Sequence, residues 1–296
     1  MSSSTTTFKP AGPDDVRIEG DLQRKQSFIR TKTGVLLVQG AIVIVLLAAW
    51  QYGTGNPTKR FVLLDEFYVG KPSDIWSTLV NWQESGELIP NAWFTLKAAL
   101  IGFAVGCAGG MLTGFFLGIS DLANKIIGPF VTAAFSVPRL ALTPLFVLWF
   151  GLGLSSKVAL VALIIFFLVF FNTYGGVREV DRALLDVLRV MGASRLEIHL
   201  KVTLPSIMTW IIAGLRISVP YAFVSAVIGE MLGGREGLGT LLQRSSATFN
   251  PAGIFAAIVL VVIMSLALNA VVSILEKRVL RWRASTDENL RAGAGI

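Results

Sequence analysis

The chain has 296 residues, of which 53% are hydrophobic and 15% are charged, and its formal net charge is +7. A soluble domain carries about 25% charged residues, so the composition excludes an ordinary soluble domain and indicates a protein that crosses a membrane several times. A single cysteine and a single histidine exclude a disulfide framework and a multi-histidine metal site. The basic residues lie mainly at the ends of apolar runs, where membrane topology accounts for them, so nucleic-acid binding is not indicated.

Residues 1–33 are polar and carry six lysine or arginine residues, which predicts a loose cytoplasmic tail. Residues 34–52 form the first run of membrane-spanning length, because the hydrocarbon core requires roughly 20 apolar residues. This run starts late and has no clear small-x-small cleavage site, so we expect a retained anchor rather than a signal peptide.

Glycine recurs at every fourth position of the second apolar run, residues 92–119: Gly102, Gly106, Gly110, Gly114 and Gly118. Residues four apart lie on the same face of a helix, so one side of this helix carries almost no side chains. We expect that face to pack closely against a neighbouring helix.

Three prolines interrupt the third run, residues 126–150, at Pro129, Pro138 and Pro144. Each proline removes a helical hydrogen bond, so we expect a broken element whose first part lies at the membrane surface. Three further runs bring the number of predicted transmembrane helices to six; they are residues 157–177, 206–232 and 253–275.

The distribution of lysine and arginine predicts the orientation of these spans. With the N-terminus inside, the inner segments carry seventeen of these residues and the outer segments carry six. Positive residues favour the cytoplasmic side, so both termini and the polar segment of residues 178–205 are expected in the cytoplasm. The transmembrane domain is thus predicted over residues 34–283, with a cytoplasmic tail over residues 284–296.

The polar segment of residues 178–205 separates two long apolar runs. Its apolar residues recur every three or four positions and its charged residues occupy the other side, which predicts an amphipathic surface helix. Opposite charges three or four residues apart support this helix in water; the pairs are Arg178 with Asp181, Arg182 with Asp186, and Asp186 with Arg189.

Gly192 is predicted to end that helix, because glycine adopts the left-handed cap conformation at little cost. Ser194 followed by Glu197 has the form of a capping box, so a second short helix is expected over residues 195–201. Leu204 and Pro205 are expected to end the second helix. The two helices would form a knob for another protein to bind, and an ordinary amphipathic connector on the membrane is the alternative.

The spacing in this segment resembles the EAA loop of permease subunits in binding-protein-dependent ABC importers. The family pattern is Glu-Ala-Ala, three residues, Gly, nine residues, and Ile-x-Leu-Pro. Here Asp replaces Glu and two larger residues replace the alanines, whereas the spacing is kept. The coupling positions that the resemblance implies are Asp186, Val187, Leu188, Gly192, Ala193, Ser194, Val202, Leu204 and Pro205.

Six further segments are similar to landmarks of the nitrate, sulfonate and taurine branch of that family; they are residues 71–76, 137–141, 143–145, 149–153, 214–216 and 237–239. The resemblance implies a type I ABC importer permease fold in a bacterial inner membrane, with a cytoplasmic coupling loop. It also implies three kinds of partner, namely cytoplasmic ATPase subunits that bind ATP and magnesium, a second permease copy in a homodimer, and an extracytoplasmic solute-binding protein.

No G-x-x-x-x-G-K-[ST] loop is present to cradle phosphates, so the chain is predicted to be a non-catalytic subunit without a cofactor or metal of its own. The branch resemblance favours a small anion as the solute, such as a sulfonate, nitrate or a carboxylate. The same machinery importing a neutral or cationic vitamin or pyrimidine precursor is the alternative. An ion-coupled secondary transporter and a membrane-bound enzyme are less favoured, because the spans hold few ionisable residues and no catalytic cluster is evident.

Three ionisable residues are candidates for the translocation path: Arg216, Arg139 and Glu230. Arg216 lies ~15 Å into the fifth span, where it either attracts an anionic solute or, as we favour, pairs within the protein. Arg139 either faces the path or, as we favour, extends to the inner surface. Glu230 is expected near the outer end of its span, either exposed beside a gate or in contact with the solute.

Overall fold

The computed structural model describes residues 32–55 and 64–280, whose regular structure is helical apart from two strands of two residues each, which confirms the all-α class. Most of the two predicted cytoplasmic tails lies outside the described residues. The elements in chain order are α2 (Lys32–Gly53), β1 (Thr54–Gly55), β2 (Leu64–Asp65), α3 (Glu66–Val69), α4 (Pro72–Glu84), α5 (Leu88–Ile119), α6 (Asp121–Phe135), the 3-10 turn η1 (Arg139–Leu142), α7 (Thr143–Phe150), α8 (Leu154–Arg178), α9 (Arg182–Val190), α10 (Arg195–Ile198), the π-helical turn η2 (His199–Thr203), α11 (Leu204–Met231), α12 (Leu238–Ala247) and α13 (Pro251–Val279).

The chain divides into two compact units, which meet between Ser73 and Asp74. In the first unit, α2 contains a 20-residue apolar stretch that is long enough to cross a membrane. The two short strands pair in parallel after it. The Trp50 indole N–H donates to the Gly70 carbonyl at 3.1 Å, which ties the end of α2 to the chain beyond α3.

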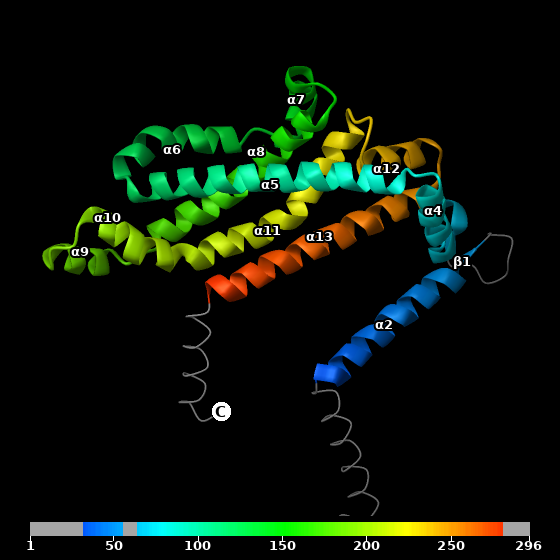
Figure 1. The fold of residues 1–296 in the computed structure, drawn as a ribbon, viewed down its shortest axis with the longest axis horizontal. Coiled ribbons are helices and arrows are strands. Elements are labelled where there is room, and N and C mark those ends of the chain that lie inside the picture. Colours follow the sequence, from blue (N-terminus) through cyan, green and yellow to red (C-terminus); the bar gives the residue numbers. More distant parts are fainter. Residues whose placement is uncertain (1–31, 56–63, 281–296) are drawn as a thin grey trace, which may run out of the picture. The chain divides into compact units, whose positions relative to one another are not determined.

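The second unit is a helical bundle in which α5, α8 and α11 lie side by side (Figure 1). The glycine face of α5 meets α8, because a Cβ added at any of the five glycines would come within 2.5–2.7 Å of an α8 atom. The predicted packing face is therefore confirmed, and the two backbones approach closely along their whole contact. Small and branched residues complete the core, among them Ala98, Ile165, Val169 and Ala222.

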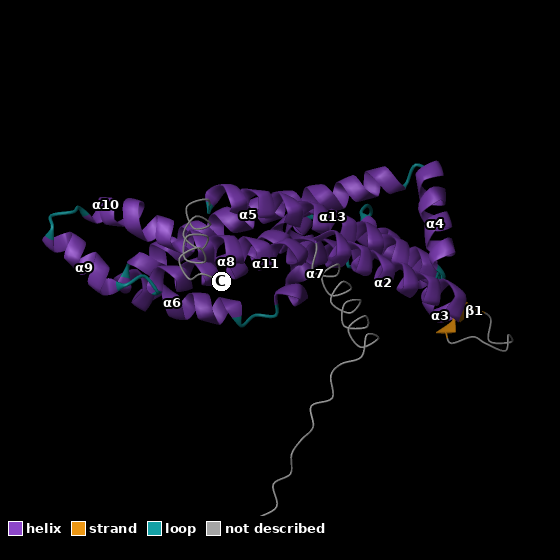
Figure 2. Ribbon diagram, turned by 90° about the horizontal axis from the view of Figure 1, so that it is seen from below, coloured by secondary structure: helices purple, strands orange, loops and turns teal. Residues whose placement is uncertain are grey.

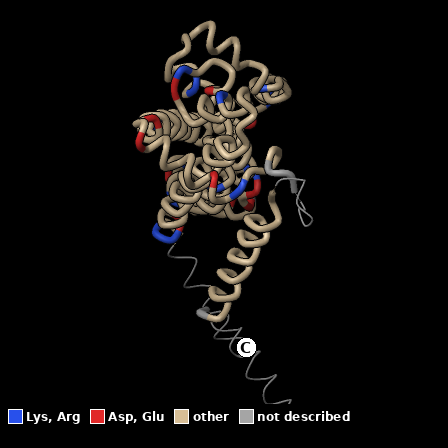
Figure 3. The backbone as a smooth tube through the Cα atoms, turned by 90° about the vertical axis from the view of Figure 1, so that its right-hand side faces the viewer, with Lys and Arg blue, Asp and Glu red and all other residues tan. Residues whose placement is uncertain are grey.

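The third apolar run is broken, as its prolines predict. Helix α6 and the η1–α7 segment meet at a bend of 80° and qualify as a membrane span only as a pair. The described chain thus has five helices long and apolar enough to cross a membrane, or six with this bent pair. Figure 2 shows α6 along the edge of the helical bundle, and Figure 3 shows that most of the bundle's backbone carries neither acidic nor basic residues.

The expected end of a helix at Leu204 and Pro205 is wrong. The chain stays helical from α10 through η2 into α11, and Pro205 lies in the first turn of α11. Proline is tolerated in a first turn, and the wider π-helical turn before it removes the need for a break. The second short helix is consequently a four-residue turn that joins a long helix, rather than a separate helix over residues 195–201.

Candidate functional site

The polar segment forms a helix-turn-helix at the end of the bundle opposite the start of α12 (Figure 1). Asp181 begins α9, because its carboxylate accepts a hydrogen bond from the Ala183 N–H at 2.8 Å. The predicted pair of Asp186 and Arg189 is present at 2.7 Å. Arg178 differs from its predicted pairing, since it ends α8 and forms its ion pair with Asp121 of α6 instead of Asp181.

Gly192 turns the chain between the two helices, as predicted. Its φ is +86°, which is strained for any residue with a side chain, yet nothing lies within 4 Å of an added Cβ. The Ala193 N–H donates to the Leu188 carbonyl at 3.0 Å and the Gly192 N–H donates to the Arg189 carbonyl at 3.0 Å. This is the Schellman arrangement, so backbone conformation alone selects glycine here.

The predicted capping box is also present at the start of α10. The Glu197 N–H donates to the Ser194 hydroxyl at 3.3 Å, and the Ser194 N–H donates to the Glu197 carboxylate at 3.1 Å. Hydrogen bonds from the Ser194 backbone and hydroxyl, together with Lys201, lower the pKa of the Glu197 carboxyl from 4.5 to about 2. The start of α10 is therefore a charged, tightly ordered turn at neutral pH.

Several apolar side chains of the α9–α10 helix pair are exposed. Val190 is 89% exposed and Met191 is 77% exposed, and Val187 and Leu196 are also exposed. Ile198 is buried at 2% exposure and anchors α10 to the bundle. Exposed apolar residues gathered beside charged ones are typical of a surface that another protein covers.

Helices α6 and α8 are joined next to the helix pair formed by α9 and α10. The ion pair of Arg178 with Asp121 joins the end of α8 to the start of α6, and the Arg178 guanidinium also lies 5.6 Å from the Tyr174 ring. A cavity of about 220 Å³ lies beneath α9, and Asp186, Arg189 and both partners of the ion pair line it. The site therefore combines an ion pair between α6 and α8 with two charged residues of α9, Asp186 and Arg189, on the wall of the same cavity.

The structure places the three path candidates apart from one another. Arg216 pairs with Glu276 of α13, and its guanidinium also donates to the Ser273 hydroxyl at 3.4 Å. This agrees with the favoured pairing within the protein. The Arg216 side chain remains 50% exposed, so it is not sealed inside the bundle.

Arg139 lies against two aromatic rings, and its expected reach to the inner surface stays a prediction. Its guanidinium lies 4.4 Å from the centre of the Phe135 ring and 5.7 Å from that of Phe167. Phe167 is near the middle of α8, so the two rings hold Arg139 halfway along that helix. Within the described chain, no ion pair is recorded for this residue.

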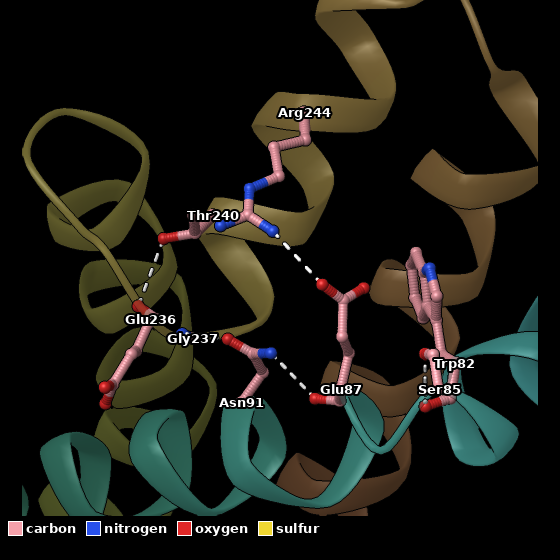
Figure 4. A network of polar contacts seen from close by, with 8 residues as sticks. All are labelled: Trp82, Ser85, Glu87, Asn91, Glu236, Gly237, Thr240 and Arg244. Carbon is pink, nitrogen blue, oxygen red and sulfur yellow. Dashed lines mark hydrogen bonds and ion pairs between the residues drawn. The ribbon is translucent and has the colours of Figure 1, made fainter.

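Glu230 is fully buried, which excludes its expected exposure beside a gate in this structure. Its carboxylate accepts hydrogen bonds from the Thr95 hydroxyl at 3.0 Å and from the Gly239 N–H at 2.8 Å. Asn91 accepts from the Gly237 N–H at 2.7 Å, and Figure 4 shows Asn91 of α5 beside this loop. Side chains from α5 and α11 thus cap α12, which has no side-chain cap of its own.

Lys157 is one of the six basic residues that the predicted topology assigns to the outside, and the sequence does not predict its burial. It is 1% exposed, and its ammonium donates to the carbonyls of Leu152 and Gly233, each at 2.8 Å. A lysine at the start of an apolar run was the available signal, but its two nearest acceptors are backbone carbonyls, which no side-chain pattern reveals.

Comparison with known families identifies the chain. Residues 108–282 match the family described as binding-protein-dependent transport system inner membrane component. This stretch covers more than half of the chain, and the chain belongs to that family. It is the permease subunit of an ABC importer, as the resemblance of its coupling loop implied.

Several relatives carry names that state different solutes. SsuC of Bacillus subtilis, named for aliphatic sulfonate transport, is 32% identical over 81% of this chain and 86% of its own length. The formylaminopyrimidine transport permease protein ThiX of Halalkalibacterium halodurans is 31% identical over 78% of this chain and 97% of its own. The riboflavin transport system permease protein RibX of Chloroflexus aurantiacus is 32% identical over 82% of this chain and 89% of its own.

A solved chain of the MetNI methionine ABC transporter shares the fold. It matches with a TM-score of 0.54 and 19% sequence identity, over 64% of this chain and 97% of that one. At this identity the likeness shows the fold alone, and it confirms the expected type I ABC importer permease architecture.

Proposed function

We propose that this permease imports small organic or inorganic anions, with sulfonates as the preferred class, and that cytoplasmic ATPase subunits drive it by binding α9 and α10. The single observation that supports the ATPase contact is the turn at Gly192, which holds the exposed Val190 and Met191 at the tip of a braced helix pair. Rigid-body movement of an ATPase at this tip would reach α8 through the short connection from Arg178 to α9, and α6 through the ion pair of Arg178 with Asp121.

The same proposal places both termini and α9 on the cytoplasmic side of the membrane. Seventeen lysine and arginine residues lie in the segments assigned to the inside and six in those assigned to the outside. This bias supports a cytoplasmic position for both termini and for α9. ATP and magnesium would then bind the partner ATPase rather than this chain.

Two permease copies are proposed to enclose the path, because six spans are few to surround a solute alone. Each copy would engage one ATPase subunit, and an extracytoplasmic binding protein would deliver the solute. Mass measurement of the purified complex in detergent tests this, and a complex with one permease copy would contradict it.

Uptake into proteoliposomes tests the proposed cargo. The complete complex is reconstituted with ATP inside, and labelled 1-butanesulfonate is added outside with the binding protein. We expect uptake that requires ATP hydrolysis and is unaffected when the membrane potential is dissipated. Uptake driven by membrane potential without ATP would contradict the proposal.

A second candidate cargo is a neutral or cationic vitamin or pyrimidine precursor. The relatives named for formylaminopyrimidine and riboflavin transport favour it, since they match at 31% and 32% identity. Competition distinguishes the two cargos. A sulfonate importer should lose uptake of labelled 1-butanesulfonate when excess taurine is added, and should keep it when excess riboflavin is added.

A further inference from the structure

Helix α6 carries a line of polar positions along one face. Asn124, Gly128, Thr132 and Ser136 follow one another at intervals of four residues, and none of the residues of α6 is buried. The hydroxyls of Thr132 and Ser136 each donate to the backbone carbonyl four residues earlier, at 3.1 Å. Residues four apart share a helix face, so this polar face is continuous.

The polar face of α6 borders a groove against α8. The groove has a volume of about 700 Å³, within the range of small-molecule sites, and α8 contributes the rings of Phe170, Phe171 and Tyr174 to its wall. Phe170 and Tyr174 stack with their ring centres 5.8 Å apart. The groove therefore combines a polar side with an aromatic side.

Positive charge flanks this groove. Lys125 lines it, and every other lining residue in the described chain is uncharged. Arg139 follows the far end of α6, and its ring partner Phe135 contacts the groove residue Phe171 with ring centres 4.8 Å apart. The nearby carboxylate of Asp121 is already paired with Arg178. Lys125 is therefore the one charged side chain among the described residues that line the groove.

Helix α6 forms a candidate span only together with the η1–α7 segment, and its two faces differ in polarity. The opposite side of α6 presents Leu122, Ile126 and Phe130, which suit lipid or another apolar surface. A polar face is costly against lipid, and this one is expected to line water, protein or a solute. The positive side chains of Lys125 and Arg139 near this face favour an anionic solute.

We propose that the groove between α6 and α8 binds the transported anion. Lys125 and Arg139 attract the charged group, and Phe170, Phe171 and Tyr174 contact the apolar part of an organic sulfonate. The inference rests on the proposed import of small anions and adds the site within this chain. Arg139 does not line the groove itself but lies over the Phe135 ring, which contacts the groove residue Phe171.

The first test is uptake of 1-butanesulfonate by the reconstituted complex carrying Lys125→Met or Arg139→Met. We expect the initial rate to fall about tenfold in each variant, the loss of one charge-assisted contact. Lys125→Arg is expected to keep most of the rate because it keeps the charge. Lys97→Met is the matched control, since Lys97 lies 5.5 Å from the Trp93 ring, outside the groove, and its loss should leave uptake unchanged.

The outcomes separate this inference from the proposed function. If a Lys125→Met/Arg139→Met double variant takes up 1-butanesulfonate at the wild-type rate, the proposed solute site in the groove is overturned. The proposed import of anions is not affected by that result. A wild-type importer that takes up a formylaminopyrimidine and no anion would overturn the proposed cargo, and the groove inference with it.

Cysteine labelling provides a second test that does not depend on transport. In the purified complex, we expect 1-butanesulfonate to slow maleimide modification of Ser136→Cys in the groove and to leave Ile127→Cys, outside it, unaffected. The native Cys107 is buried and gives little background. Equal labelling of Ser136→Cys with and without 1-butanesulfonate, or protection by phosphatidylglycerol vesicles alone, would overturn the inference.

Discussion

The Glu230 carboxylate accepts a hydrogen bond from the backbone N–H of Gly239 at 2.8 Å, so a side chain at the end of α11 caps the start of α12. The N–H groups of a first helical turn lack partners within the helix, and a carboxylate there is also favoured by the helix dipole. Glu230 therefore fastens α12 to the bundle and is not free to meet a solute in this conformation.

Glu230→Ala should lower the thermal unfolding midpoint of the purified protein. The change leaves the buried N–H of Gly239 without an acceptor, at a cost of about 1–3 kcal/mol. Glu236→Ala is the control, because Glu236 is exposed in the same loop (Figure 4) and its loss should change stability by about 0.5 kcal/mol or less. Equal midpoints for the two variants would contradict the capping role.

Gly110→Ala should destabilise the contact between α5 and α8. The added Cβ would lie 2.6 Å from the Phe166 carbonyl oxygen, which is backbone and moves only with its helix. A cost of about 1–3 kcal/mol is expected for such overpacking, measured as a lower unfolding midpoint. Gly175→Ala, where nothing lies within 4 Å of the new Cβ, should be neutral, and a loss of stability there would argue against packing as the cause.

Gly192→Val should reduce the amount of ATPase that copurifies with the permease, together with uptake. Valine at a φ of +86° costs at least about 1–2 kcal/mol, and the turn relieves this strain by moving α9. Gly86→Val is a matched control, since Gly86 has a φ of +76° and equally open space between α4 and α5. Loss of ATPase in both variants would indicate general misfolding instead of a specific contact.

Arg216 and Glu276 should act as a structural pair rather than as a solute contact. Arg216→Glu is expected to lower the yield of folded protein, and adding Glu276→Arg should restore it, because the pair is then reversed. Uptake of 1-butanesulfonate by the reversed pair should match the wild type. A reversed pair that folds normally and fails to transport would assign Arg216 to the path.

Local features of the site could be predicted because they depend on residues close in sequence. The turn at Gly192 and the capping box of Ser194 and Glu197 involve residues three to five positions apart. Glycine at a left-handed position and serine before a helix have direct conformational causes, so each was visible in the sequence.

Long-range pairings could not be predicted in the same way. Arg178 pairs with Asp121, 57 residues earlier, although Asp181 is nearer in sequence. The two carboxylates are chemically equal, but Asp181 caps α9, and the packing of α6 near the end of α8 brings Asp121 to Arg178. Lys157 is buried for a similar reason, because its acceptors are carbonyls that meet only in the folded bundle.

The central claim is that the tip of α9 contacts an ATPase in the cytoplasm, and cross-linking at Val190 tests it most directly. Val190 is 89% exposed, so Val190→Cys is expected to leave the fold intact. In intact cells, a short bifunctional maleimide that crosses the membrane should join Val190→Cys to a cysteine introduced at the facing surface of the ATPase subunit, and an impermeant thiol reagent added outside should not react. Labelling of Val190→Cys by the impermeant reagent, with no ATPase cross-link, would contradict the account.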